Sequence, residues 1–277
     1  MRSVTRTTLP IPVLILAGLM LPEPAHAGEG GYRLLELEGY KVKWGDRRLG
    51  TGASISYAFA GSRLRFDEAR NCGELAPIET LVGEKLSRKT LSRETAAAFQ
   101  VWERAAGLSF HEVSDPHDAD IVLGAQGKPR GSAFANVSYA SEEKDGVRAI
   151  EQSLVCLNPE HKWKVGFDGD EDVYDIRYTL IHEIGHAIGL DHPGPSGQVM
   201  AFRYTEAYND LQSGDLRGVQ LLYGHAADDD KLAAIAVTQA EQEPTEVYQV
   251  NNLNRQSITD TAESALPVIN GSAEAKP

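Results

Sequence analysis

The pattern of apolar and polar side chains predicts strands that alternate with helices. Residues 53–59 alternate in polarity, which is typical of a strand with one apolar face. Apolar residues then recur at helical spacing up to Gly107, the expected stop, and Ser92 is the expected N-cap. Residues 28–45 read as an ordered lead-in, and residues 60–90, which lack a clear period, as a long connection. Further strands are expected at residues 108–113, 119–124 and 148–157. This alternation indicates a largely parallel sheet.

Two more helices are expected in the second half of the chain. Asp175 is well placed to cap the first of them. Its buried side would be formed by Ile176, Leu180, Ile181, Ile184 and Ile188. Residues 211–224 are predicted to form the last helix, with Ser213 as its cap and Gly224 as its stop.

The two ends of the chain differ in composition from the part between them. Two arginines, an apolar run over residues 11–21 and a small-x-small sequence ending at Ala27 are typical of a secretion signal. We expect cleavage after Ala27, because the run is too short to span a membrane comfortably. Residues 225–277 hold one aromatic residue and are predicted to form a disordered acidic tail. The expected organisation is a signal peptide over residues 1–27, one domain over residues 28–224, and this tail.

The charge and the cysteine content narrow the range of partners. With 27 basic and 40 acidic residues the formal net charge is −13, which disfavours binding to nucleic acid or to an acidic membrane surface. Export would permit a disulfide. We expect Cys72 and Cys156 to form one, the alternative being two buried free thiols.

The sequence HEIGHAIGLDH, residues 182–192, carries the candidate chemistry. Residues four apart on a helix share a face, so His182 and His186 can bind one Zn²⁺. Glu183 lies about 100° further around the helix, which suits a general base acting on water at the metal. A glycine would then end the helix, and the returning chain would bring His192 as a third ligand. Three protein ligands leave one position open, which is typical of catalytic zinc.

Residues 44–224 resemble the matrixins, a branch of the metzincin zinc endopeptidases. The resemblance rests on the histidine motif, GLSFHEV and ADIVLGAQG as strands, AAAFQVW in the first helix, a Met-turn at Met200, and the closing GVQLLYG. We interpret the chain as a matrixin-like zinc metalloprotease of a bacterial-type, secreted form. The resemblance implies an α/β fold of the α+β zincin type. Its twisted five-stranded, mostly parallel sheet and three main helices would enclose a cleft between two subdomains.

The resemblance also implies a substrate site. An edge strand containing Ala133, Phe134, Ala135 and Asn136 would align an extended peptide as an added antiparallel strand, and Tyr204 would form a pocket wall. Main-chain hydrogen bonds would give such binding affinity without sequence dependence.

Two departures from typical matrixins concern metals. The loop over residues 126–131 is short, and no histidine lies between His117 and His161, so we expect no second, structural zinc. The acidic loop over residues 167–172 lacks the spacing of a calcium loop. We therefore expect a solvated turn there, with calcium as the less favoured alternative, and one catalytic zinc as the cofactor.

The expected function is hydrolysis of peptide bonds by a metal-activated water with Glu183 as base. The enzyme would be a monomer, secreted or periplasmic, with protein or peptide substrates and no membrane anchor. One alternative is a catalytically degenerate binding protein on the same fold, suggested by the lack of a family-type propeptide, the shortened loop and the acidic tail. Another is an amidase that acts on cell-wall peptides.

Overall fold

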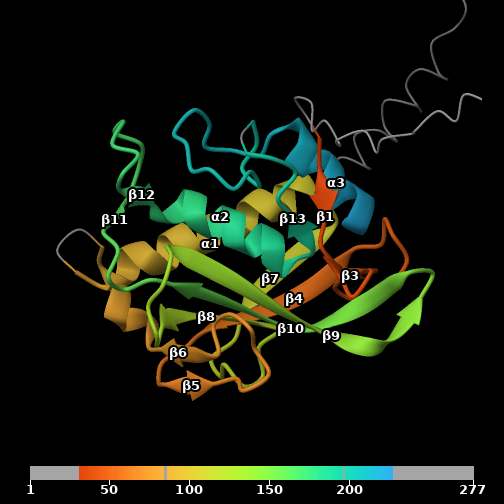
Figure 1. Cartoon of the computed structure of the whole chain (residues 1–277), viewed down its shortest axis with the longest axis horizontal. Helices are drawn as coiled ribbons and strands as arrows, with labels where there is room; N and C mark the ends of the chain where they lie inside the picture. The colour runs from red at the N-terminus through yellow and green to blue at the C-terminus, as the bar shows by residue number, and fades with distance from the viewer. Residues whose placement is uncertain (1–30, 84–85, 196, 227–277) are drawn as a thin grey trace, which may run out of the picture. The chain divides into compact units, whose positions relative to one another are not determined.

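A twisted sheet with helices packed on one face forms the framework of the chain in a computed structural model, which describes residues 31–83, 86–195 and 197–226 (Figure 1). The helices are α1 (Arg88–Ala105), α2 (Ile176–Ala187) and α3 (Ser213–Tyr223), with a short 3-10 helix η1 (Ile78–Leu81). The strands are β1 (Arg33–Leu34), β2 (Glu36–Leu37), β3 (Tyr40–Lys43), β4 (Ala53–Phe59), β5 (Leu64–Arg65), β6 (Glu74–Ala76), β7 (Leu108–Glu112), β8 (Ile121–Gln126), β9 (Ala133–Lys144), β10 (Val147–Leu157), β11 (Trp163–Lys164), β12 (Tyr174–Asp175) and β13 (Leu190–Asp191).

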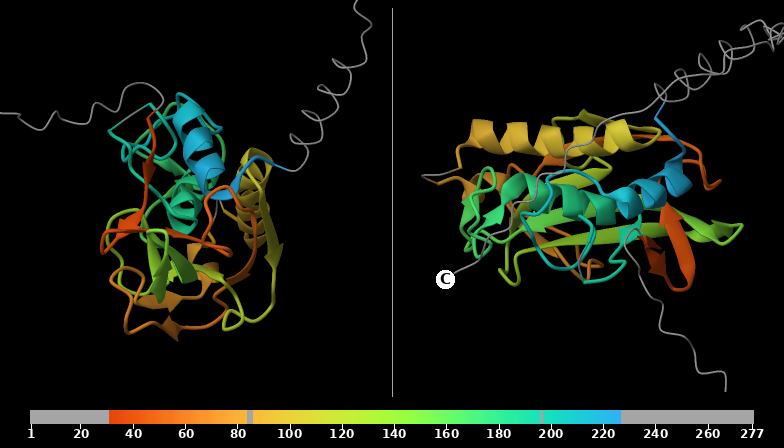
Figure 2. Two further views of the ribbon diagram at one scale, coloured as in Figure 1. Left: turned by 90° about the vertical axis from the view of Figure 1, so that its right-hand side faces the viewer. Right: turned by 90° about the horizontal axis from the view of Figure 1, so that it is seen from above.

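Five strands make the centre of the sheet in the spatial order β7-β4-β8-β10-β9. Four of them run parallel, and β9 pairs antiparallel with β10. The predicted five-stranded, mostly parallel sheet with three main helices is thus confirmed. The helices α1 and α2 lie side by side on one face of this sheet, and β9 runs below α2 (Figures 1 and 2).

Apolar side chains fill both faces of the sheet. The larger cluster lies between the sheet and the helices and includes Phe99, Trp102, Ile184 and Met200. A smaller cluster lies on the other face, under β5 and β6, and includes Leu75 and both cysteines. The chain therefore buries a core large enough to hold α2 in a fixed position over the sheet.

The lead-in and the connection contain more structure than the sequence indicated. Residues 28–45 include three short strands: β1 pairs with β13, β2 with β3, and β3 with β10. The long connection expected over residues 60–90 contains β5, β6, η1 and the first turn of α1, which the sequence did not indicate. These strands are two or three residues long, too short to produce a recognisable alternation.

Helix starts differ from those predicted at two places. Ser87, and not Ser92, caps α1: its hydroxyl accepts a hydrogen bond from Thr90 N at 3.1 Å. The residue before Ser213 caps α3: the Gln212 side chain and Asp215 form a reciprocal capping box. In both cases several residues near the helix start have capping side chains, and the sequence does not distinguish among them.

The predicted domain boundaries at residues 27 and 224 stay predictions. The signal peptide lies outside the described residues, and so does the tail from residue 227 onward. Among the helices of the described part, none combines the length and the apolar character needed to cross a bilayer.

The predicted disulfide is confirmed. Cys72 and Cys156 are bonded, with their Cα atoms 5.7 Å apart and 84 residues apart in sequence. Cys156 belongs to the central strand β10, whereas Cys72 belongs to the connection before β6. The bond therefore attaches that connection to the middle of the sheet.

Removing the disulfide is expected to lower the free energy of unfolding by about 2–5 kcal/mol, because a long loop regains its freedom in the unfolded chain. The variant is Cys72→Ala with Cys156→Ala, measured by urea unfolding against the oxidised wild type. A loss below about 1 kcal/mol would show that the cross-link contributes little to stability.

Candidate metal centre

The local fold of residues 175–192 turns the motif into a three-sided cluster. Asp175 caps α2 by accepting a hydrogen bond from Tyr178 N at 2.7 Å, as the sequence predicted. Gly189 follows the helix with φ of +100°, and a Cβ there would lie 2.3 Å from the carbonyl oxygen of Val42. The turn thus needs glycine for its backbone angle and for its close approach to β3. Strand β13 then pairs with β1, which directs His192 back toward α2.

The three histidines meet at their Nε2 atoms. These atoms lie 3.2 Å apart between His182 and His186, and 3.0 Å from each of the two to His192. In a tetrahedral zinc site with Zn–N bonds of 2.0–2.1 Å, ligand nitrogens lie about 3.3 Å apart. The spacing of these donors therefore fits a zinc ion.

Backbone carbonyls determine which ring nitrogen of His182 and of His186 carries no proton. His182 Nδ1 lies 2.7 Å from the Val199 oxygen, and His186 Nδ1 lies 2.9 Å from the Leu190 oxygen. A carbonyl only accepts, so each Nδ1 carries the proton and each Nε2 presents a lone pair. Such second partners orient metal-binding imidazoles. The donor set fits zinc in chemistry as well as in spacing.

Burial keeps these imidazoles neutral. It lowers the pKa of His182 to about 3 and the pKa of His186 to about 4. The pKa of His192 is also lowered, again mainly by burial. Neutral imidazole is the form that binds a metal, so the site requires no deprotonation of His182 or His186 near neutral pH.

Glu183 lies next to the cluster and faces the sheet edge. Its side chain is buried. Burial raises the pKa of Glu183 to about 8, and the backbone N–H of Ala135 in β9 opposes part of that rise. A buried carboxyl group beside the three nitrogens has the position a general base would need.

The segment after the histidines, which contains Met200, packs against α2 and supports the histidine cluster. Met200 is buried, and Gly185 leaves it room, since a Cβ at Gly185 would lie 2.2 Å from the Met200 sulfur. The Asp215 carboxylate accepts hydrogen bonds from Val199 N at 3.0 Å and Met200 N at 3.1 Å. It also accepts one from Gln212 N at 2.9 Å. Sequence reasoning missed Asp215, although an acidic residue in the first turn of a helix was the available signal.

The residues predicted to bind substrate divide into two groups. Ala133 and Ala135 lie in the part of β9 that faces α2. Phe134 packs with the smaller core cluster on the other face of the sheet. The Asn136 side chain accepts a hydrogen bond from Asn71 N at 3.1 Å, so it is engaged away from the cluster. These two side chains are therefore not cleft-facing, as alternation along a strand requires.

Tyr204 lies beside the start of α2, about two turns before His182. Its hydroxyl accepts a hydrogen bond from Asp175 N and donates one to Glu206, both at 2.9 Å. Its ring stacks on Tyr174, with centroids 4.6 Å apart. The pocket wall predicted for Tyr204 stays a prediction.

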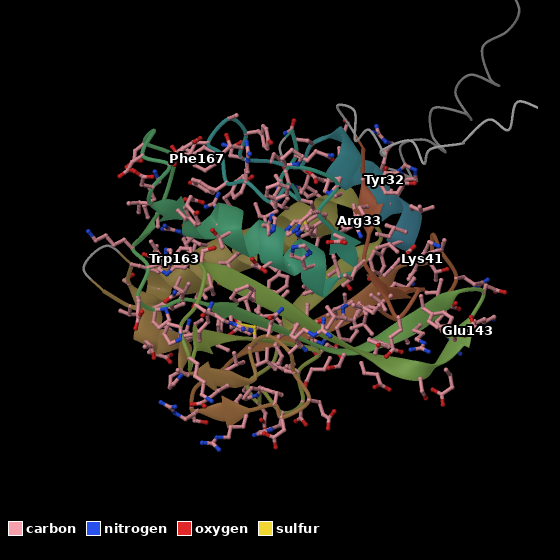
Figure 3. All side chains as sticks on the ribbon, viewed as in Figure 1. Tyr32, Arg33, Lys41, Glu143, Trp163 and Phe167 are labelled. Carbon is pink, nitrogen blue, oxygen red and sulfur yellow. A yellow bond between two sulfur atoms is a disulfide. The ribbon has the colours of Figure 1, made fainter. Side chains whose placement is uncertain are left out.

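The acidic residues of the loop, Asp168 to Asp172, are exposed, as expected of a solvated turn, but the loop also surrounds a buried cation. The side chain of Lys164 is 7 % exposed, and its ammonium group forms ion pairs with Asp168 and Glu206. It also donates to the Asp170 carbonyl at 2.6 Å. The loop is thus organised around the ammonium group of Lys164. This lysine precedes the acidic run, and the sequence did not indicate that the two would pair. Phe167 marks this loop at one end of α2, and Glu143 marks the far end of β9 (Figure 3).

Comparison with known proteins agrees with this geometry. The matrixin family model matches residues 78–224, more than half of the chain. The chain belongs to the matrixin family, a family of zinc metalloendopeptidases.

Individual relatives come from animals, bacteria and plants. The chain is 30 % identical over 162 residues to matrix metalloproteinase-16 of Homo sapiens. This match covers 52 % of this chain and 24 % of the relative. It is 29 % identical over 144 residues to karilysin of Tannerella forsythia, covering 49 % and 29 % respectively. It is 30 % identical over 155 residues to metalloendoproteinase 1-MMP of Arabidopsis thaliana, covering 52 % and 40 %. The chain thus matches well under half of the length of each of these three relatives.

Asp215→Asn is expected to lower the free energy of unfolding by about 1–3 kcal/mol. An amide NH₂ in place of one carboxylate oxygen leaves at least one buried N–H without an acceptor. Urea unfolding measures the loss. The exposed Asp210→Asn is the matched control, with a change within about 0.5 kcal/mol. Equal stability of the two variants would contradict the role given to Asp215.

Proposed function

We propose that this chain is a secreted zinc-dependent endopeptidase that hydrolyses bonds within proteins or peptides. The observation that carries the proposal is the meeting of three Nε2 atoms, 3.0–3.2 Å apart, beside the buried Glu183. His182, His186 and His192 would hold the ion. Zinc is the only metal in the proposal. Calcium is not included, because the ammonium group of Lys164 already pairs with carboxylates at the acidic loop.

When bound, zinc would supply Lewis-acid chemistry that activates water and polarises the scissile carbonyl. Glu183 would take the proton of the attacking water and pass it to the leaving amine. The free edge of β9 would bind the substrate as an added strand, and its backbone groups would fix the position of the scissile bond.

The alternatives make different use of the same site. A degenerate binding protein would have no reason to keep three convergent imidazoles and a neighbouring carboxyl group together. A cell-wall amidase would keep them, so only the substrate separates it from a protease. Cleavage of casein that stops with a chelator, and no release from purified peptidoglycan, is the result the proposal requires. The export step rests on the signal peptide, and the monomeric state stays a prediction.

His192→Ala is expected to weaken zinc binding by more than about 100-fold, beyond the loss seen when an outer partner of a ligand is removed. Zinc content after dialysis, measured by mass spectrometry, should be about one ion per wild-type chain and near zero in the variant. His161→Ala, whose ring lies near Trp163, is the control and should keep its zinc. Full retention by His192→Ala would remove this residue from the ligand set.

Glu183→Gln is expected to keep the zinc and the fold but to lower turnover by about 10²–10⁴-fold, because the side chain no longer moves a proton. Initial rates of casein cleavage at matched zinc content provide the measurement. The exposed Glu160→Gln is the control. Turnover within a factor of two of wild type would exclude Glu183 as the base.

A further inference from the structure

The strand β9 has one edge paired with β10 and one edge without a partner strand in the described sheet. Asn158 N–H, just past β10, donates to the Ser132 carbonyl at 2.8 Å. Along a strand the N–H and C=O groups of successive residues point to opposite edges. The backbone groups of Phe134 and Asn136 therefore also point toward β10. The backbone groups of Ala133, Ala135 and Val137 therefore face away from β10.

The carbonyl of Ala135 is already engaged on that edge. It accepts a hydrogen bond from Asn71 Nδ2 at 3.3 Å. Asn71 belongs to the connection between β5 and β6, and it lies outside the residues matched by the family model.

Asn71 is itself firmly held. Its N–H donates to Asn136 Oδ1 at 3.1 Å, and its Oδ1 accepts a hydrogen bond from Arg130 Nη2 at 2.9 Å. A guanidinium only donates, so the amide oxygen must face Arg130 and the amide NH₂ must face Ala135. The next residue, Cys72, is bonded to Cys156, which pairs with Phe134 across the strands. The disulfide thus fixes Asn71 beside β9.

From these contacts we infer that Asn71 is a positioning residue for the peptide-binding edge, an inference that rests on the proposed function. It fixes the Ala135 carbonyl on the unpaired edge of β9. A carbonyl oxygen has two lone pairs, so the bond from Asn71 leaves one for the N–H of a bound peptide. A group tied by a disulfide and by hydrogen bonds is suited to fixing a strand and unsuited to moving aside.

Asn71→Asp tests this role with the least change in shape. The carboxylate keeps an acceptor for Arg130, but it turns an oxygen, in place of a donor, toward the Ala135 carbonyl. We expect KM for a fluorogenic peptide to rise about five- to tenfold, the effect of one lost hydrogen bond, with kcat within about twofold and zinc content unchanged. The exposed Asn209→Asp is the matched control and should leave KM unchanged.

Two kinetic results would overturn the inference. An unchanged KM with a lowered melting temperature would mean that Asn71 only stabilises the fold. A lower KM would mean that Asn71 competes with the peptide for the Ala135 carbonyl.

Hydrogen exchange separates this inference from the proposed function. Amide exchange in residues 133–139 needs no catalysis, and it should be about tenfold faster in Asn71→Asp than in wild type. Exchange in α2 should not change. If the wild type cleaves no peptide, the proposed function fails and exchange alone decides the role of Asn71. Equal exchange in wild type and variant would overturn it.

Discussion

The arrangement of this chain depends on holding three imidazole Nε2 atoms 3.0–3.2 Å apart, close to the spacing of ligands around one zinc ion. One helix can supply only two of these groups on one face. The third requires that the helix end at once and that the chain reverse. Gly189 permits the reversal because its backbone angle and its contact with Val42 exclude a side chain. The lead-in strands β1 and β3, which pair far along the chain, thereby become part of the support of the site.

A second layer of buried polar groups keeps the cluster in place. Buried donors and acceptors are costly unless paired, so each pairing restricts the backbone that contributes it. Val199 shows how these restrictions are linked: its carbonyl accepts from His182, and its N–H donates to Asp215. The start of α3 is thus connected through one residue to a histidine of α2. Met200, packed against Gly185, adds an apolar contact at the same level.

The features that could be predicted from the sequence are those that depend on nearby residues. The motif at residues 182–192, the cap at Asp175 and the strand at residues 53–59 each depend on neighbours within a few positions, and each is confirmed as local structure. The short strands β1 and β3 depend on partners more than 100 residues away, so their sequences carry no sign of the pairing. Lys164 was missed for the same reason, since one of its acceptors, Glu206, follows the Met-turn. The two cysteines were paired correctly because the sequence holds only these two.

In the proposed function a peptide adds to the free edge of β9 beside the zinc site, and the charges along this strand distinguish that part of the edge from the rest. An unpaired strand edge invites association with other chains, and proteins commonly protect such edges with charged side chains. In β9 the far end carries Glu142, Glu143 and Lys144, all exposed, whereas residues 133–139 are uncharged. In the uncharged part, the Asn71 side chain donates a hydrogen bond to the Ala135 carbonyl. The part of the edge without charge protection is therefore the part next to Glu183, and its backbone is held by a fixed side chain before any substrate arrives.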